Sequence, residues 1–393
     1  MISIISWFGF MDVGLGHGLR NKFAVAKANG DHEKAKKYVS TTYAILFIIV
    51  GIFFLCFVVV NGFNPWTTIL NVDENFNQEL SQLALIVFSF FSLKFVAKLV
   101  TTIIVADQKP AVRDVVNLVS KIIILITIFL LTRTTTSSLI YVGLAYTGLP
   151  VLVLVLASFY FYNTTYRKYS PSIKSIDFSY AKDLIGLGWK FFVIQISVTI
   201  LFTTDNIIIS QLFGPAEVTP YQIANKYYGI VLMFFAILIS PMWSAYTEAF
   251  EKDDFDWIKN VIRKQEKTWL LIILIVIGMT IIAEPVYKFW VGEEVRISLF
   301  LSACWGLFVI LQTYNIIYTY FLNGVGMVKL QMITATISIF INIPLSIFFA
   351  RTIGLGLPGV ILATCVSIFI YSITRKIQVT KIINGNATGI WGQ

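Results

Sequence analysis

The feature that most constrains this chain is a series of ten long apolar runs. Most are about 20 residues long, the length an α-helix needs to cross ~30 Å of hydrocarbon. A bilayer core offers no water to the backbone, so spanning segments form helices or closed barrels, and the runs lack the period-2 alternation of barrel strands. The sequence therefore predicts an all-α polytopic membrane protein. The runs cover 40–62, 81–105, 115–132, 139–163, 189–211, 224–246, 268–287, 298–323, 331–350 and 358–374.

The loops between these runs are alternately basic and non-basic. One side of the membrane receives 22 of the 30 Lys and Arg residues, the other receives 5, and Lys94, Lys98 and Lys121 fall inside runs. Because basic loops stay in the cytoplasm, the loop 12–39 and the C-terminus are predicted to be cytoplasmic. The net charge of +9 then reflects the basic loops on the cytoplasmic side of the membrane, and it does not indicate a nucleic-acid partner.

The predicted topology divides the chain into two halves. Residues 1–11 resemble the second half of an inward-running helix, so we expect a full-length form with twelve helices, of which about ten are complete here and the N-terminal span is missing. The predicted domains are an N-terminal lobe (1–165), a cytoplasmic linker (166–188), a C-terminal lobe (189–378) and a cytoplasmic tail (379–393). Two such halves are typical of transporters built from internal repeats.

The loops also limit the possible functions. No loop exceeds about 30 residues, too few for a domain with its own core, and no P-loop motif is present. Neither a soluble catalytic domain nor a nucleotide-binding domain fits within this sequence, so an enzyme is not expected. Cys56, Cys304 and Cys365 lie in apolar runs without paired spacing, which favours packing roles over metal or disulfide chemistry.

Several stretches carry a family resemblance. These are DVGLGHGLRNK from Asp12, followed by a basic loop with Gly30, Asp31 and Ala35; TDNIIISQLFGPAEVTPYQIANKYY from Thr204; PMWSAYTEAF from Pro241; and the later FINIPLSIFFA and GLPGVILAT. Together they resemble the Wzx-type O-antigen and capsule flippases, the polysaccharide transporter branch of the MOP superfamily, with a MATE-like two-lobe fold. The sequence departs from this pattern in lacking the first span and in having His17 where Asn is expected.

The resemblance implies a flippase of the bacterial inner membrane. Its substrate would be an undecaprenyl-diphosphate-linked oligosaccharide, moved to the periplasmic leaflet for O-antigen (lipopolysaccharide), capsule or exopolysaccharide biosynthesis. Partners would be this lipid-linked oligosaccharide, the bilayer and the polysaccharide polymerase machinery, and no nucleic acid. An antiporter-like mechanism with Na⁺ or H⁺ as the coupling ion, and no other cofactor or metal, is expected.

Charged residues inside spans are costly and are therefore candidates for function. Lys94 and Lys98 lie four residues apart, on one helix face, and with Lys121 they form a candidate cationic lining for the diphosphate. The alternative for Lys98 and Lys121 is that they extend toward cytoplasmic headgroups. Arg20 is a further candidate at the cytoplasmic mouth, or a residue that only sets orientation.

An acidic residue and several amides complete the candidate site. Asp205, with Asn206 and Gln195, is a candidate ion-coupling site; a structural ion pair or a water-facing helix end are the alternatives. Gln312, Tyr314, Asn315 and Tyr318 place amides and aromatic rings on one helix, which suits a sugar, although such groups also join membrane helices.

Two other functions remain open on the sequence alone. A MATE-like ion-coupled exporter of small molecules would favour an acidic cavity for cationic drugs, whereas the spans, away from their ends, carry three Lys and one Asp. A membrane polysaccharide polymerase or glycosyltransferase would need a large periplasmic loop with catalytic residues. The longest outside loop, 63–80, has only scattered acids.

Overall fold

The computed structural model describes residues 14–63, 77–134 and 139–393, and all regular elements in these ranges are helical. Nine described helices are long and apolar enough to cross a membrane, and a tenth span is formed if the bent pair α12–α13 counts as one. These observations confirm the predicted all-α, multi-span fold. The partial helix predicted at residues 1–11 lies outside the described residues.

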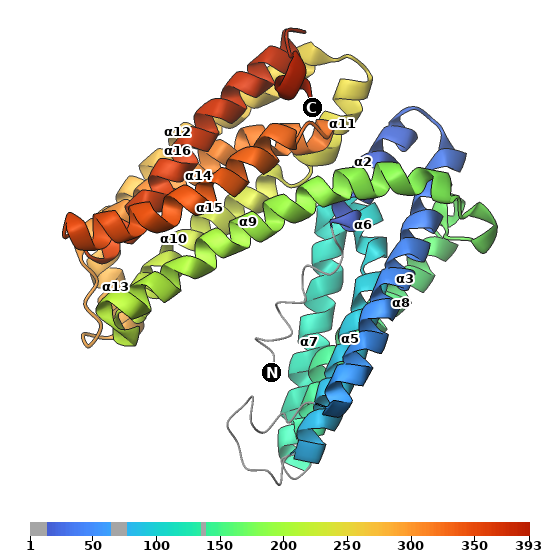
Figure 1. Ribbon diagram of the computed structural model, residues 1–393, viewed down its shortest axis with the longest axis horizontal. Coiled ribbons are helices and arrows are strands. Elements are labelled where there is room, and N and C mark those ends of the chain that lie inside the picture. The colour runs from blue at the N-terminus through green and yellow to red at the C-terminus, as the bar shows by residue number, and fades with distance from the viewer. Residues whose placement is uncertain (1–13, 64–76, 135–138) are drawn as a thin grey trace. The chain divides into compact units, whose positions relative to one another are not determined.

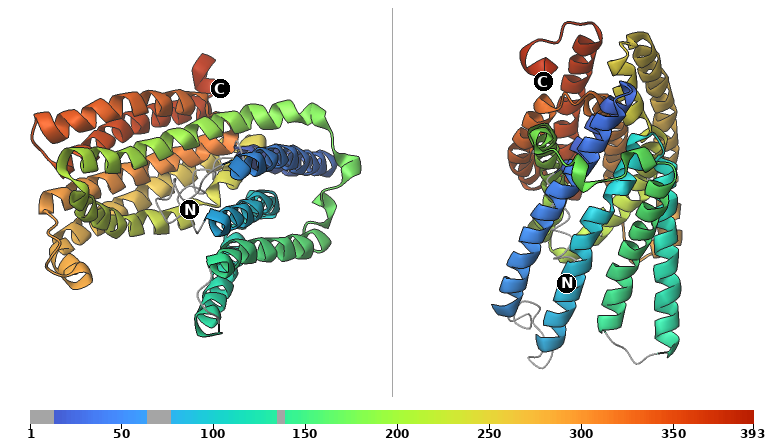
Figure 2. Two further views of the ribbon diagram at one scale, coloured as in Figure 1. Left: turned by 60° about the horizontal axis from the view of Figure 1, so that its bottom comes forward. Right: turned by 90° about the vertical axis from the view of Figure 1, so that its right-hand side faces the viewer.

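The chain divides into two compact units, which we call the N-terminal unit (Met1–Trp189) and the C-terminal unit (Lys190–Gln393). The long helices α3, α5, α8 and α7 of the N-terminal unit pack side by side in that order (Figures 1 and 2). The described helices of this unit are α2 (Leu15–Ala28), α3 (His32–Phe63), α5 (Asn77–Ala97), α6 (Leu99–Ala106), α7 (Pro110–Thr134) and α8 (Leu139–Asn163).

The turn between α2 and α3 shows how local sequence sets the start of a span. Gly30 has φ +73°, a left-handed conformation that glycine adopts without strain. The Asp31 carboxylate accepts a hydrogen bond from the Lys34 amide at 2.9 Å, which caps an otherwise unpaired donor at the start of α3. Ala35 is fully buried. The motif Gly30-Asp31-x-x-x-Ala35 therefore forms the turn between α2 and α3 and caps the start of α3.

A second turn, between α6 and α7, is held by Asp107. Its carboxylate side chain is only 6% exposed and pairs with Lys27 of α2 and, at 2.7 Å, with Lys109. The Tyr166 hydroxyl, from the segment after α8, donates a hydrogen bond to it at 2.9 Å. Burial raises the pKa of Tyr166 to about 12, so this phenol keeps its proton at neutral pH. One carboxylate thus connects three segments of the N-terminal unit.

The segment predicted as a linker, 166–188, is largely ordered. It contains three short 3₁₀ turns (Arg167–Tyr169, Ile173–Ser175 and Phe178–Tyr180) and then the first residues of α9 (Ala181–Phe213). Helix α9 therefore begins in the N-terminal unit and ends in the C-terminal unit.

Helix α14 (Leu299–Val325) is the centre of the C-terminal unit and packs against α10, α11, α12 and α16 (Figure 1). The Ser298 hydroxyl caps its start by accepting from the Leu301 amide at 3.1 Å, and Gly326, with φ +75°, ends it. The other helices are α10 (Val218–Ile239), α11 (Met242–Glu251), α12 (Phe255–Ile281), α13 (Ala283–Val291), α15 (Lys329–Ile347) and α16 (Leu357–Ile383), with a π-helical turn at Phe348–Thr352 after α15.

Two helices of this unit extend well beyond their apolar runs, toward the side predicted to be cytoplasmic. Helix α12 begins at Phe255, so residues 255–267 belong to the same helix as the apolar run that starts at residue 268, and Ile258 and Ile262 pack into the core. Helix α16 continues to Ile383, through residues predicted as loop and into the predicted tail. Polar residues on these extensions can therefore lie inside the helix bundle.

Candidate functional site

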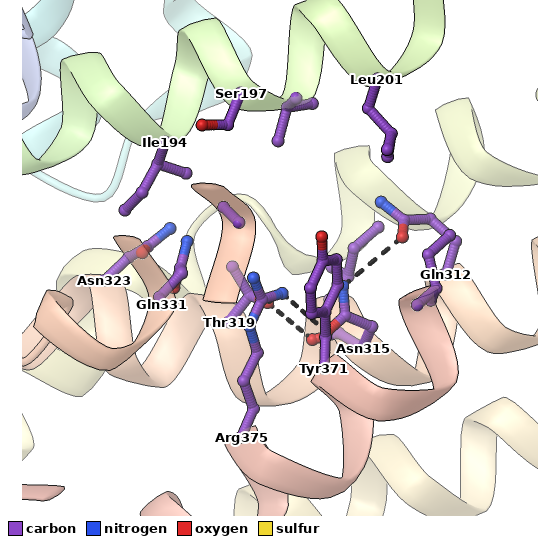
Figure 3. Close-up of a pocket in the computed structure, with 14 residues that line it drawn as sticks. Ile194, Ser197, Leu201, Gln312, Asn315, Thr319, Asn323, Gln331, Tyr371 and Arg375 are labelled. Carbon is purple, nitrogen blue, oxygen red and sulfur yellow. Dashed lines mark hydrogen bonds between the residues drawn. The ribbon is translucent and has the colours of Figure 1, made fainter. Parts of the chain in front are cut away.

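The C-terminal unit contains a cavity of about 210 Å³ bounded by α9, α14, α15 and α16 (Figure 3). Eight of its fourteen lining residues are polar, and Arg375 is the only charged one. The polar residues are Ser197, Gln312, Asn315, Thr319, Asn323, Gln331, Tyr371 and Arg375. A polar cavity among membrane-spanning helices is unfavourable unless water or a ligand satisfies its groups, so it is the first candidate for function.

Helical periodicity explains why these residues face the same space. On α14, Gln312, Asn315, Thr319 and Asn323 follow one another at intervals of three or four residues, which places them on one face. On α9, Ile194, Ser197, Val198 and Leu201 follow the same spacing and form the opposite wall. The cavity thus has an amide-rich wall on α14 and a mostly apolar wall on α9.

Arg375 reaches into this space from α16, with the end of its guanidinium directed toward α9 and α14 (Figure 3). Its Nη1 donates to Asn315 Oδ1 and to Thr319 Oγ1, each at 2.6 Å, and the guanidinium lies 5.4 Å from the centroid of the Tyr371 ring. Arg375 is 6% exposed, and its Nε makes no hydrogen bond. No carboxylate in the described part of the chain lies within ion-pair distance of it. Every observed partner of this buried cation is therefore neutral.

Gln331, near the start of α15, is a second incompletely bonded group of the cavity. Its side chain is 3% exposed, and its Oε1 accepts no hydrogen bond. A buried amide oxygen without a donor costs about 1–3 kcal/mol. A ligand hydroxyl in the cavity would remove that cost.

Asp205 is the buried acid of the same unit. It lies on α9, one turn beyond Leu201, and is 2% exposed. The Tyr221 hydroxyl donates to its Oδ2 at 2.7 Å, whereas its Oδ1 accepts no hydrogen bond. No described Lys or Arg lies within ion-pair distance. An ionised carboxylate in this setting is costly, and a bound proton or cation would remove the cost.

In the described structure, neither of the other two predicted ion-coupling residues forms a side-chain hydrogen bond with Asp205. Asn206 Oδ1 accepts from Gln222 Nε2 at 2.6 Å, which ties α9 to α10. Gln195 is half-buried on α9 and is not among the residues that line the cavity. The candidate ion site therefore centres on Asp205 and Tyr221.

The four residues predicted on α14 separate into two groups. Gln312 and Asn315 line the cavity, where Asn315 Nδ2 donates to Gln312 Oε1 at 3.4 Å. Tyr314 and Tyr318 lie outside it: the Tyr318 hydroxyl donates to Glu266 at 2.5 Å, and Lys376 donates to the Tyr314 hydroxyl at 2.9 Å. This second group also includes the Lys376–Glu266 pair at 3.7 Å, so its charges are balanced.

The predicted cationic residues all belong to the N-terminal unit and are not among the residues that line this cavity. Lys94, at the end of α5, and Lys121, on α7, are exposed. Lys98 is half-buried, its ammonium group is 4.7 Å from the centroid of the Phe95 ring, and it is close enough to Lys94 for electrostatic repulsion. Arg20 is buried in α2. The role of these four residues as a diphosphate site stays a prediction.

Of the cavity lining, the sequence singled out only Gln312 and Asn315, and Arg375, Tyr371 and Gln331 are among the residues that it missed. Arg375 was counted with the cytoplasmic loop because the apolar run ends at residue 374. A usable signal was present: Tyr371, Arg375, Gln378 and Ile382 continue the helical spacing of α16 into the basic segment.

Comparisons with known proteins agree with this architecture. The family model described as polysaccharide biosynthesis protein matches residues 6–246, and the MatE model matches residues 191–348. A Yersinia pseudotuberculosis protein named for O-antigen export is 22% identical over 83% of this chain and 75% of its own length. A Salmonella typhimurium protein named for O-antigen transport is 20% identical over 98% of this chain and 88% of its own length.

Solved structures show the same fold. An outward-facing multidrug resistance MATE transporter of the MOP superfamily has a TM-score of 0.78 at 14% identity, covering 98% of this chain and 86% of that one. A mutant of a Vibrio cholerae MATE transporter has a TM-score of 0.79 at 14% identity, covering 100% of this chain and 89% of that one. The chain therefore belongs to the polysaccharide biosynthesis protein family, the branch of the MOP superfamily that contains the Wzx-type flippases.

Proposed function

We propose that this protein is a flippase of the bacterial inner membrane that moves an undecaprenyl-diphosphate-linked oligosaccharide from the cytoplasmic to the periplasmic leaflet. Its product would serve O-antigen, capsule or exopolysaccharide biosynthesis. The family match and the relatives named for O-antigen export and transport support this assignment. The substrate is amphiphilic, so its polar end needs a polar route past the lipid tails.

The polar cavity of the C-terminal unit is the main structural observation that supports this proposal. Amides, hydroxyls and one buried cation gather among helices that are otherwise apolar. Such groups are expensive to keep in a membrane unless they serve a polar ligand. A glycan supplies the hydroxyl groups that the amides can bind.

The other candidate residues have separate roles in this proposal. Lys94, Lys98 and Lys121, with Arg20, attract the diphosphate as several weak contacts. Asp205 binds and releases H⁺ or Na⁺, and this exchange drives alternating access between two lobes. No covalent step is involved, so the protein acts as a transporter rather than an enzyme, and delivers its product to the polymerase machinery.

A MATE-like exporter of small molecules is the second candidate, favoured by the structural neighbours. That likeness concerns the fold alone. The one charged residue in the cavity lining is a cation, which disfavours the cationic drugs that an acidic cavity would attract. The cavity chemistry therefore supports the glycan substrate.

Deletion of the gene in its own bacterium tests the proposal. We expect surface polysaccharide to disappear and complete lipid-linked units to accumulate on the cytoplasmic side, with both effects reversed by the gene in trans. Incomplete lipid-linked units would indicate a glycosyltransferase instead, and unpolymerised units at the surface would indicate a polymerase. Normal polysaccharide with increased sensitivity to a toxic small molecule would indicate the exporter.

A further inference from the structure

The unbalanced charge of the cavity indicates what kind of group it binds. Arg375 is bonded to a neutral amide oxygen, a neutral hydroxyl and an aromatic face, and no described carboxylate offsets it. A buried cation without an anion is strongly unfavourable. Its guanidinium uses Nη1 for both protein hydrogen bonds and directs its other terminal nitrogen toward the space below α9 (Figure 3). An anionic ligand there would complete the ion pair.

The size of the cavity is sufficient for about one ring. A cavity of ~150 Å³ in a protein core holds a benzene molecule. This cavity, at about 210 Å³, has room for one six-membered ring with polar substituents. A single sugar residue fits this description, and further residues of a glycan would extend outside the cavity.

The remaining lining has the donors and acceptors that a sugar ring requires. Gln312 and Gln331 offer amides that both donate and accept, and Ser197 offers a hydroxyl from the opposite wall. Gln331 Oε1 is buried without a donor and would accept from a sugar hydroxyl. The Tyr371 ring adds an aromatic face beside Arg375.

A carboxylate matches this cavity better than a diphosphate does. A planar carboxylate carries one charge and pairs with one guanidinium edge. A diphosphate carries at least two charges, and enzymes that bind such groups surround them with several cations or metal ions. The cavity lining supplies one cation and a row of neutral amides. The single positive charge of the lining therefore balances the single negative charge of one sugar acid.

We propose that this cavity binds one acidic sugar residue of the transported glycan, such as a hexuronate, with its carboxylate on Arg375 and its hydroxyls on the amides of α14 and α15. This inference rests on the proposed flippase function and adds the class of sugar. Arg375 is then a specificity-determining residue. Flippases for neutral glycans would not need it.

Calorimetric titration of the purified full chain tests the inference with two matched probes. Methyl glucuronide and methyl glucoside differ only in the carboxylate that replaces a hydroxymethyl group. We expect the glucuronide to bind at least about tenfold more tightly, a difference of ~1.4 kcal/mol. Inorganic diphosphate, the third probe, should neither bind the cavity nor compete with the glucuronide.

Variants assign the binding to the cavity. Arg375→Met should abolish the preference for the glucuronide, and Arg375→Lys should restore part of it. Lys376→Met is the matched control: it removes the adjacent cation, which contacts Tyr314 and Glu266 rather than the cavity, and should leave binding unchanged. Ser197→Leu fills the cavity from α9 without removing the charge and should weaken both glycosides.

Equal binding of the two glycosides, or displacement of the glucuronide by diphosphate, would overturn the inference. So would an unchanged preference in an Arg375→Met protein that elutes and melts like the wild type. Because these titrations need no transport, a negative result leaves the flippase proposal to the gene deletion. Conversely, normal polysaccharide after deletion would remove the function even if the sugar acid binds.

Discussion

Two buried carboxylates, one in each unit, have opposite surroundings. Asp107 of the N-terminal unit is bound by Lys27, Lys109 and the Tyr166 hydroxyl, and it holds a turn between helices. Asp205 of the C-terminal unit receives one hydrogen bond from Tyr221, and its second oxygen receives none. A fully paired buried charge contributes to structure, whereas an incompletely paired one stores a cost that a ligand can relieve.

The same contrast holds for the cations. Lys27 and Lys109 have a carboxylate partner, whereas Arg375 has only neutral partners. Asp205 and Arg375 also do not neutralise each other. Asp205 is electrostatically close to Cys365 on α16, ten residues before Arg375, which corresponds to about 15 Å along that helix. In the C-terminal unit, the Asp205 carboxylate and the Arg375 cation are thus separated, and each can bind a different ligand.

The largest effect expected from this contrast is that of Asp205→Asn on transport. The substitution keeps the shape and removes the charge, so the residue can no longer bind and release a cation. We expect the rate of lipid-linked oligosaccharide transport to fall at least about a hundredfold, or ~2.7 kcal/mol. The unfolding free energy should change by less than about 1 kcal/mol, because no ion pair is lost.

The amount of surface polysaccharide at matched membrane expression measures transport. Thermal unfolding followed with a thiol-reactive dye measures the change in stability, because Cys304 and Cys365 are buried in the same unit as Asp205. Asp114→Asn, an exposed acid that pairs with Arg113 on α7, serves as control and should alter neither. Full transport by Asp205→Asn would show that its incomplete pairing has no functional role.

Asp107→Asn is expected to give the reverse result, at smaller magnitude. It leaves Lys27 and Lys109 without their anion, but both side chains are about half exposed and can be hydrated. We expect a loss of about 1–2 kcal/mol of stability, with transport per folded molecule retained. Melting followed by helical circular dichroism checks this, with Glu248→Gln, in an exposed pair with Lys252, as the control. A stable but inactive Asp107→Asn protein would contradict the comparison.

The contrast also explains what the sequence could predict. Apolar runs were sufficient to predict the helical multi-span fold, because the formation of a membrane-spanning helix depends on that local property. The orientation inferred from Lys and Arg stays a prediction. The cavity depends instead on which faces of four helices meet, and only Gln312 and Asn315 of its lining were predicted. Arg375 was missed because a hydropathy run ends before it, although the helix does not.

The predicted residues Gln312, Tyr314, Asn315 and Tyr318 do not form one group in the structure, because the four residues do not share one face of α14. Gln312 and Asn315 are three residues apart and share one face, and the two tyrosines are four apart and share another. Because successive residues of a helix are rotated by about 100°, the two pairs point in different directions. In the structure, Asn315 bonds to Gln312, whereas Tyr318 bonds to Glu266. Spacing could have separated them, but it could not identify the pair that faces the cavity.

The smallest expected effect concerns the lysines of the N-terminal unit. Lys94 and Lys121 are exposed rather than packed among neighbouring helices, so we expect each to act as one of several weak contacts to a diphosphate. We expect Lys94→Gln to lower transport less than about twofold, ~0.4 kcal/mol. Substituting Lys94, Lys98 and Lys121 together should lower it several-fold, and less strongly at high salt, where the attraction is already screened. The same polysaccharide assay, with Lys252→Gln as the control, measures both. If Lys94→Gln alone stopped transport, the N-terminal unit would also contain a charge that is essential for transport. The contrast between paired charges in the N-terminal unit and incompletely paired charges in the C-terminal unit would then no longer explain function.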